Sequence, residues 1–94
     1  MALDRITEKM REKLAVTPFS GSLKFDCGAA GVIVLADGTA SRDDRAADCT
    51  IKVTEDNLVK LLTGKLNPMT GVVTGKLKVS GDPTVAMKLA KLIG

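Results

Sequence analysis

The sequence predicts an α+β fold, in which helices gather on one face of a mostly antiparallel sheet. Two observations support this prediction. The spacing of apolar residues switches along the chain between the helical period of about 3.6 residues and the strand period of two, and most strand segments are grouped instead of alternating strictly with helices. The 94 residues suffice for one hydrophobic core, so we expect a single domain over residues 1–94.

The first segment predicts an amphipathic helix that ends before Pro18. Its apolar residues recur at helical spacing, and the positions between them are mostly charged. The stripe consists of Leu3, Ile6, Met10 and Leu14. A helix of this kind packs its apolar stripe on a core and leaves its charged side in solvent.

Strands follow as far as residue 53. Residues 23–27 alternate apolar and polar side chains, which indicates a strand with one buried face. Residues 32–35 are apolar on both faces, which predicts a central or covered strand, and Asp37-Gly38 is a turn signal that continues these strands as a meander. Residues 41–48 are polar and indicate a loop with at most a short strand, and residues 49–53 alternate again.

Two short helices, a strand and a last helix complete the predicted order. Thr54 is a good N-cap for a helix that Gly64 ends, and Asn67-Pro68 starts a second helix. Residues 76–80 alternate as a strand, and Asp82-Pro83 opens the C-terminal helix. The apolar faces comprise Leu58, Leu61 and Leu62 in the first helix, Met69, Val72 and Val73 in the second, and Ala86, Leu89, Ala90 and Ile93 in the third.

The tetrapeptide Thr-Gly-Lys-Leu occurs twice, at residues 63–66 and 74–77. A lysine after a glycine is also found in phosphate-binding P-loops, but neither copy has the earlier glycine or the following Ser or Thr of that motif. We therefore interpret both copies as helix C-caps.

The composition argues against most catalytic and metal chemistry. The chain has no histidine, which removes the commonest general base and the commonest metal ligand. Cys27 and Cys49 form neither a CxxC pair nor a zinc pattern, so we expect two buried, reduced thiols; an enzyme that uses one of them is the alternative. Asp43-Asp44 is flanked by arginines and indicates a solvated loop. We therefore expect no catalytic activity, no cofactor and no metal.

The second part of the chain is strongly basic. Residues 57–94 carry six lysines against the single acid Asp82, a pattern that attracts anionic head groups or nucleic acid, with solvated surface lysines as the alternative. Two aromatic residues are too few for the stacking platforms of single-stranded nucleic-acid binding, so we expect no specific nucleic-acid partner. Because the longest purely apolar run is five residues and residues 1–5 show no signal-peptide h-region, we expect a cytoplasmic location.

Four segments from residue 47 onward carry a more specific pattern. They are Ala47–Ile51 (ADCTI), Leu62–Pro68 (LTGKLNP), Gly75–Asp82 (GKLKVSGD) and Ala86–Leu89 (AMKL). In this order they resemble the sterol carrier protein (type two) family. The resemblance implies a five-stranded sheet whose helices on one face enclose an apolar tunnel for fatty acids, acyl-CoA, sterols or similar lipids, without catalysis by the domain. Val72 and Val73 stand where the family often has bulky aromatic residues, so the resemblance does not specify a sterol.

The predicted function is the binding and intracellular carriage of an apolar ligand such as a fatty acid, an acyl-CoA or a similar lipid. The helix faces place Leu58, Leu62, Met69, Val72, Val73, Met87, Ala90 and Ile93 around the ligand, and the strands place Phe25, Ile33 and Val79 beneath it. Ordinary core packing is the alternative for each residue. Lys65, Lys76 and Lys78 are candidates for contact with the anionic head group of an acyl-CoA or with an anionic membrane surface. The competing function is a non-catalytic interaction module of the same fold, without a tunnel, that forms a homodimer or docks a partner.

Overall fold

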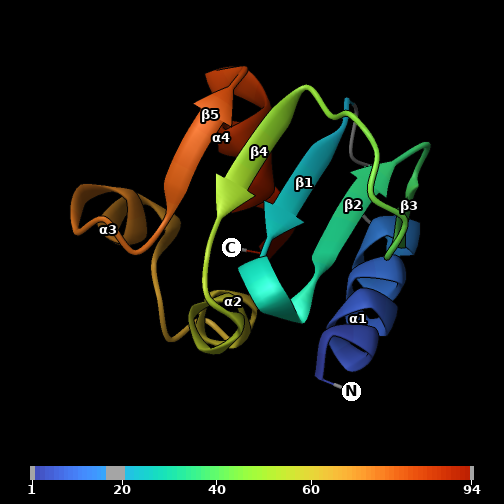
Figure 1. Ribbon diagram of the computed structural model, residues 1–94, viewed down its shortest axis with the longest axis horizontal. Coiled ribbons are helices and arrows are strands. Elements are labelled where there is room, and N and C mark those ends of the chain that lie inside the picture. Colours follow the sequence, from blue (N-terminus) through green and yellow to red (C-terminus); the bar gives the residue numbers. More distant parts are fainter. Residues whose placement is uncertain (1, 17–20, 94) are drawn as a thin grey trace.

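The computed structural model describes residues 2–16 and 21–93 (Figure 1). Its helices are α1 (Ala2–Val16), α2 (Glu55–Leu62), α3 (Pro68–Val73) and α4 (Pro83–Ile93), with a short 3-10 turn η1 (Gly28–Ala30). Its strands are β1 (Leu23–Asp26), β2 (Val32–Ala36), β3 (Thr39–Ser41), β4 (Cys49–Lys52) and β5 (Lys78–Gly81). The predicted order of helices and strands is confirmed.

The five strands form one sheet in the order β3-β2-β1-β4-β5. β1, β2 and β3 make the predicted antiparallel meander, and β5 pairs antiparallel with β4. β1 and β4 are parallel, with Phe25 opposite Ile51, because residues 42–48 return the chain from edge strand β3 to the end of the sheet where β1 begins. The mostly antiparallel sheet is therefore confirmed, with a parallel pair in its middle.

Helices cover one face of the sheet, as predicted. The inward side chains Leu23 and Phe25 of β1 are fully buried and belong to one hydrophobic cluster with the apolar stripe of α1. α1 lies against β2 and β3, α4 lies against β4 and β5, and Figure 1 shows α4 passing behind the sheet. Lys24 and Asp26 alternate with these residues and lie on the other face. Within residues 2–16 and 21–93, no helix has the length and apolar character needed to cross a bilayer.

Both Thr-Gly-Lys-Leu segments end helices, as predicted. Gly64 follows α2 with a φ of 79°, and Gly75 follows α3 with a φ of 78°, a left-handed conformation that favours glycine. The backbone N–H groups of Leu66 and Leu77 each donate to a carbonyl of the preceding helix at 3.0 Å. Each motif turns its leucine into the interior and leaves its lysine, Lys65 or Lys76, exposed.

α3 is fixed at its start and along one side. The side chain of Asn67 accepts the N–H of Met69 at 2.8 Å, and a proline occupies the first turn. Gly71 is buried, and a Cβ built on it would lie 2.8 Å from Cδ1 of Leu77 and 3.7 Å from Cδ2 of Leu66. α3 therefore packs through a glycine onto the leucines of the two Thr-Gly-Lys-Leu motifs.

Candidate functional site

Five of the residues predicted to surround a ligand lie in or against the core. Phe25, Ile33 and Leu58 are fully buried in the main hydrophobic cluster, and Leu62 and Val79 are partly buried against it. The structure therefore brings side chains of β1, β2, β5 and α2 into one layer between the sheet and the helices. Such a layer is expected both beneath a bound ligand and in an ordinary packed core.

Four other predicted residues lie at the surface. Met69 is 73% exposed, Val72 48%, Val73 84% and Met87 70%. The side chains of Ala90 and Ile93 lie outside the described residues. Periodicity correctly places Met69, Val72 and Val73 on a shared arc of α3, but this arc faces away from the core because Gly71 takes the inward side. Their participation in a ligand site stays a prediction.

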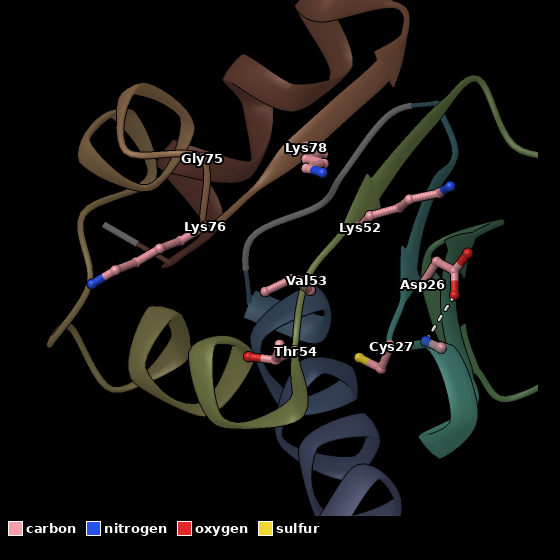
Figure 2. Close-up of a pocket in the computed structure, with 9 residues that line it drawn as sticks. Asp26, Cys27, Lys52, Val53, Thr54, Gly75, Lys76 and Lys78 are labelled. Atoms are coloured by element: carbon pink, nitrogen blue, oxygen red, sulfur yellow. Dashed lines mark hydrogen bonds between the residues drawn. The ribbon is translucent and has the colours of Figure 1, made fainter.

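A surface pocket of about 450 Å³ lies where β1 and β4 end (Figure 2). It is lined by Asp26, Cys27, Gly28, Lys52, Val53, Thr54, Gly75, Lys76 and Lys78. Three lysines thus share the pocket with one carboxylate, and Oδ1 of Asp26 accepts the N–H of Gly28 at 2.9 Å. The excess of positive charge suits an anionic group better than an apolar one.

Of the three lysines at the pocket, the sequence identified Lys76 and Lys78 but not Lys52. Lys52 and Lys78 are cross-strand neighbours of β4 and β5, and Figure 2 shows Lys76 extending away from them. Lys65, the other predicted head-group residue, does not line this pocket. Alternation along β4 does place Lys52 on the outward face. Lys52 lies next to Lys78 because β4 pairs with β5, and the local sequence pattern does not predict this pairing.

The two thiols are free and poorly activated. Burial raises the pKa of Cys27, and Glu55 and Asp26 raise it further against the opposing charge of Arg42. Burial and Asp82 raise the pKa of Cys49. Cys49 is fully buried as predicted, whereas Cys27 is only partly buried because it follows the end of β1. Since the thiolate is the nucleophile, a raised pKa makes both cysteines weak nucleophiles at neutral pH.

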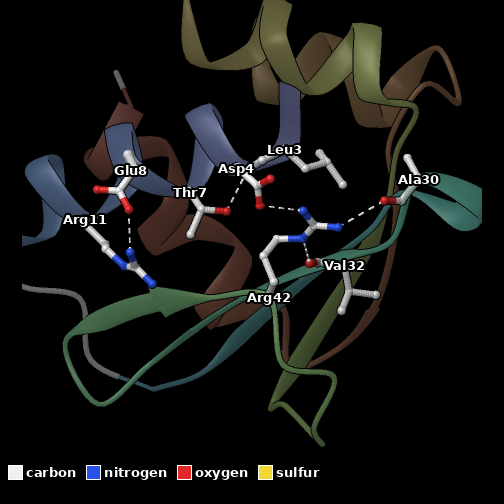
Figure 3. Close-up of polar contacts among 8 residues, drawn as sticks. All are labelled: Leu3, Asp4, Thr7, Glu8, Arg11, Ala30, Val32 and Arg42. Atoms are coloured by element: carbon white, nitrogen blue, oxygen red, sulfur yellow. Dashed lines mark hydrogen bonds and ion pairs between the residues drawn. The ribbon is translucent and has the colours of Figure 1, made fainter. Parts of the chain in front are cut away.

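Arg42 fastens α1 to the sheet (Figure 3). Its guanidinium donates to the carbonyl of Val32 at 3.0 Å and of Ala30 at 3.1 Å, and it forms an ion pair with Asp4 of α1 at 2.9 Å. A Cβ on Gly31 would lie 2.5 Å from Nη2 of Arg42, so the absence of a side chain there lets the guanidinium approach the backbone. These contacts give Arg42 a structural role, because they join the backbone around η1 and β2 to α1.

Two ion pairs link residues of the β3–β4 connection to neighbouring elements. Asp44 pairs with Lys24 at 2.6 Å, and Asp37 pairs with Arg45 at 3.2 Å. In the part of the chain that the structure describes, no three His, Cys, Asp or Glu side chains are placed to hold a metal ion. The pairs fit the predicted interpretation of this segment as a solvated loop.

Sequence comparison identifies relatives of this chain. The model of the SCP-2 sterol transfer family matches residues 2–94. Sterol carrier protein 2 of Gallus gallus is 49% identical over 53 residues, which are 56% of this chain and 10% of that protein. The chain spans about a tenth of the length of the curated sterol carrier proteins that it matches.

Solved structures share the fold. The crystal structure of Sterol Carrier Protein 2 Like 2 from Aedes aegypti superposes with a TM-score of 0.82 at 21% identity, over 99% of this chain and 97% of that one. The solution structure of Sterol Carrier Protein-2 from Aedes aegypti, a complex with the C16 fatty acid palmitate, gives a TM-score of 0.82 at 20% identity, over 100% and 96%. With the family model matching nearly the whole sequence, the chain belongs to the SCP-2 sterol transfer family.

Proposed function

We propose that this domain binds one lipid through its acyl chain, in a tunnel between the covered face of the sheet and the helices, and carries it within the cytoplasm without catalysing a reaction. The proposal rests on the apolar layer on that face, which consists of Phe25, Ile33, Leu58, Leu62 and Val79; of these, Leu62 and Val79 are only partly buried. The palmitate complex of the Aedes aegypti relative, which has the same fold, makes a fatty acid or acyl-CoA the first ligand to test.

Entry of the ligand requires the helices to move away from the sheet. Phe25, Ile33 and Leu58 are fully buried by their neighbours in this structure, so a ligand above them must displace packed side chains. An empty pocket of ~300 Å³ would cost about 7 kcal/mol at ~24 cal/mol per Å³, which rivals a typical total stability of roughly 5–15 kcal/mol. A domain of this size gains stability by closing when no ligand is bound.

The ligand can offset the cost of opening. Burial of an acyl chain contributes about 0.8 kcal/mol per CH₂, so a long acyl chain offsets the free-energy cost of the open cavity. We place Phe25, Ile33 and Val79 beneath the chain and Leu58 and Leu62 beside it, with Ala90 and Ile93 of α4 closing the tunnel. Met69, Val72, Val73 and Met87 face outward in this structure, so they would reach the ligand only when the helices move, and unbranched thioethers would then adapt to ligands of different shape.

Catalysis is not part of the proposal. The raised pKa values of Cys27 and Cys49 keep both thiols protonated near neutral pH, and the chain has no histidine to activate them. The lysine-rich second half would attract the carboxylate of a fatty acid or the phosphates of an acyl-CoA.

A thermal-shift titration tests this function. Delipidated protein is mixed with palmitate, palmitoyl-CoA or cholesterol, and binding to the native state should raise the melting temperature as ligand increases. Leu62→Lys, in the proposed wall, should abolish the shift. Val59→Lys, at an exposed position of the same helix, should retain it and controls for the added charge.

The outcomes separate the two functions that the sequence suggests. A shift with palmitate that Leu62→Lys removes supports lipid carriage. No shift with any of the three lipids, together with a dimer by native mass spectrometry, contradicts it and favours the interaction module.

A further inference from the structure

We propose that the outer side of α3 and the neighbouring lysines dock this domain on an anionic phospholipid bilayer. The α3 ridge is defined as Met69, Val72 and Val73, and the basic rim as Lys52, Lys65, Lys76 and Lys78. The inference deepens the proposed function, because it names the surface from which a carried lipid would be collected or delivered. Figure 1 shows α3 beyond edge strand β5, to one side of the sheet.

The α3 ridge is an apolar surface that the fold holds in place. Met69 and Val73 are four residues apart, so they lie together on the helix, and both lie opposite the buried Gly71. The Asn67 cap and the packing of Gly71 on Leu77 fix the helix in this orientation. The exposed apolar side chains are therefore a stable feature of the surface and face away from the core.

The basic rim flanks the ridge along the chain and on the sheet. Lys65 lies before α3 and Lys76 after it, and Lys78 lies on β5 beside the same turn. Lys52 pairs with Lys78 across β4 and β5, but its side chain extends away from Lys76, toward the side of its other cross-strand neighbour Asp26 (Figure 2). Residues 57–81 include no Asp or Glu. None of the four lysines forms an ion pair with a described residue, whereas Lys24 of β1, on the same face of the sheet as Lys52 and Lys78, pairs with Asp44 at 2.6 Å.

This combination fits a bilayer surface better than other partners. A few apolar side chains bordered by lysines can enter the head-group region while the lysines attract anionic lipids. A second copy of the chain would bring two lysine clusters together, which like-charge repulsion opposes. The backbone of a nucleic acid would use the lysines but would leave Met69 and Val73 exposed to water.

Binding to vesicles of defined composition tests the docking. The full chain is sedimented with vesicles of phosphatidylcholine, or of phosphatidylcholine mixed with phosphatidylserine. We expect binding only when phosphatidylserine is present, and weakening as salt is raised because exposed charges are screened. Each lysine near an anionic surface is worth about fivefold in affinity, so Lys76→Glu with Lys78→Glu should weaken binding by at least ~25-fold.

The α3 ridge has a matched control on α1. Val73 is 84% exposed and Val16 is 83% exposed, so Val73→Ser and Val16→Ser make the same chemical change at equally accessible sites. We expect Val73→Ser to weaken vesicle binding severalfold and Val16→Ser to leave it unchanged. Lys9→Glu on the exposed side of α1 is the corresponding control for charge and should change binding far less than the Lys76→Glu, Lys78→Glu pair.

Three results would overturn the docking proposal: no binding to phosphatidylserine vesicles, equal losses for the α1 and α3 variants, or a dimer in gel filtration that Val73→Ser dissociates. All substituted positions are exposed, and circular dichroism and melting temperature check that each variant folds. The palmitate thermal shift of the unmodified protein is measured separately. Vesicle binding without a palmitate shift removes the proposed carriage alone, and a palmitate shift without vesicle binding removes the docking alone.

Discussion

The two edges of the sheet differ in the contacts of their charged side chains and in the burial of their apolar side chains. At the β3 edge, Arg11 donates to the carbonyl of Ala40 at 2.8 Å, Arg42 bonds two carbonyls and Asp4, and the apolar stripe of α1 is buried. At the β5 edge, the basic rim lacks ion pairs to described residues, and the α3 ridge is exposed. One edge uses its residues to stabilise the fold, while the other leaves them exposed, as the proposed docking on a bilayer requires.

The largest expected difference between the two edges concerns methionine. Met10 of α1 is fully buried, whereas Met69 of the α3 ridge is 73% exposed. Met10→Ala should lower the free energy of unfolding by about 2–5 kcal/mol, because it leaves a cavity in the core. Met69→Ala should change it by no more than about 0.5 kcal/mol. Urea denaturation measures both, and similar losses would show that the edges do not differ in this way.

A smaller difference is expected for the cations. Arg42→Ala removes the contacts with Val32, Ala30 and Asp4 and should cost about 1.5–3 kcal/mol, as expected for hydrogen bonds to a charged group. Lys78→Ala at the β5 edge should stay within about 0.5 kcal/mol. An Arg42→Ala protein as stable as the Lys78→Ala protein would contradict the structural role of Arg42.

The substitution Gly71→Ala tests whether α3 packs on the core through its glycine. Gly71→Ala would bring a Cβ within 2.8 Å of Leu77, and overpacking typically costs about 1–3 kcal/mol. The better helix propensity of alanine offsets about 1 kcal/mol of this cost. We therefore expect the free energy of unfolding, measured by urea denaturation, to fall by roughly 1 kcal/mol. Thr70→Ala, at an exposed position of α3, is the control. Stabilisation by Gly71→Ala would show that α3 does not pack through its glycine.

The smallest expected effect is a dependence on pH. Burial raises the pKa of the Cys27 and Cys49 thiols, so the native state holds these protons more tightly than the unfolded chain. Their contribution to stability is therefore complete below the ordinary thiol pKa of about 8.5 and is lost as pH rises through the native values. Urea denaturation at increasing pH should show this loss, and a protein with both cysteines replaced by alanine should show less of it.

Alkylation provides a second measurement on the thiols. Iodoacetamide should label the folded protein slowly at neutral pH, with partly buried Cys27 reacting before buried Cys49. Rapid labelling of either residue in the folded state, followed by mass spectrometry, would instead favour a cysteine-dependent enzyme.

Most of the fold could be predicted from the sequence, because the local sequence signals agree with the tertiary structure. The alternation at Leu23 and Phe25 identified the buried face of β1, and the Thr54 and Asn67 caps marked helix starts that the structure confirms. The parallel pairing of β1 with β4 was not predicted. It depends on the path of residues 42–48, and a polar loop carries no pattern that fixes where it crosses.

The candidate site was less predictable for two physical reasons. Periodicity grouped Met69, Val72 and Val73 on one arc, but the orientation of that arc depends on Gly71, whose missing side chain is the signal that hydrophobicity overlooks. Lys52 joined Lys78 only through the sheet register. A ligand tunnel also cannot be read from periodicity, because residues such as Phe25 have the same pattern in a solid core and in a lined cavity.

Native mass spectrometry of the delipidated protein mixed with palmitate tests the central claim, lipid binding, most directly. We expect a complex of one protein and one palmitate that persists when the ligand is diluted. The Leu62→Lys variant should not form this complex, and the Val59→Lys variant should form it. Detection of the bare protein alone, with palmitate and palmitoyl-CoA in excess, would contradict lipid carriage by this domain.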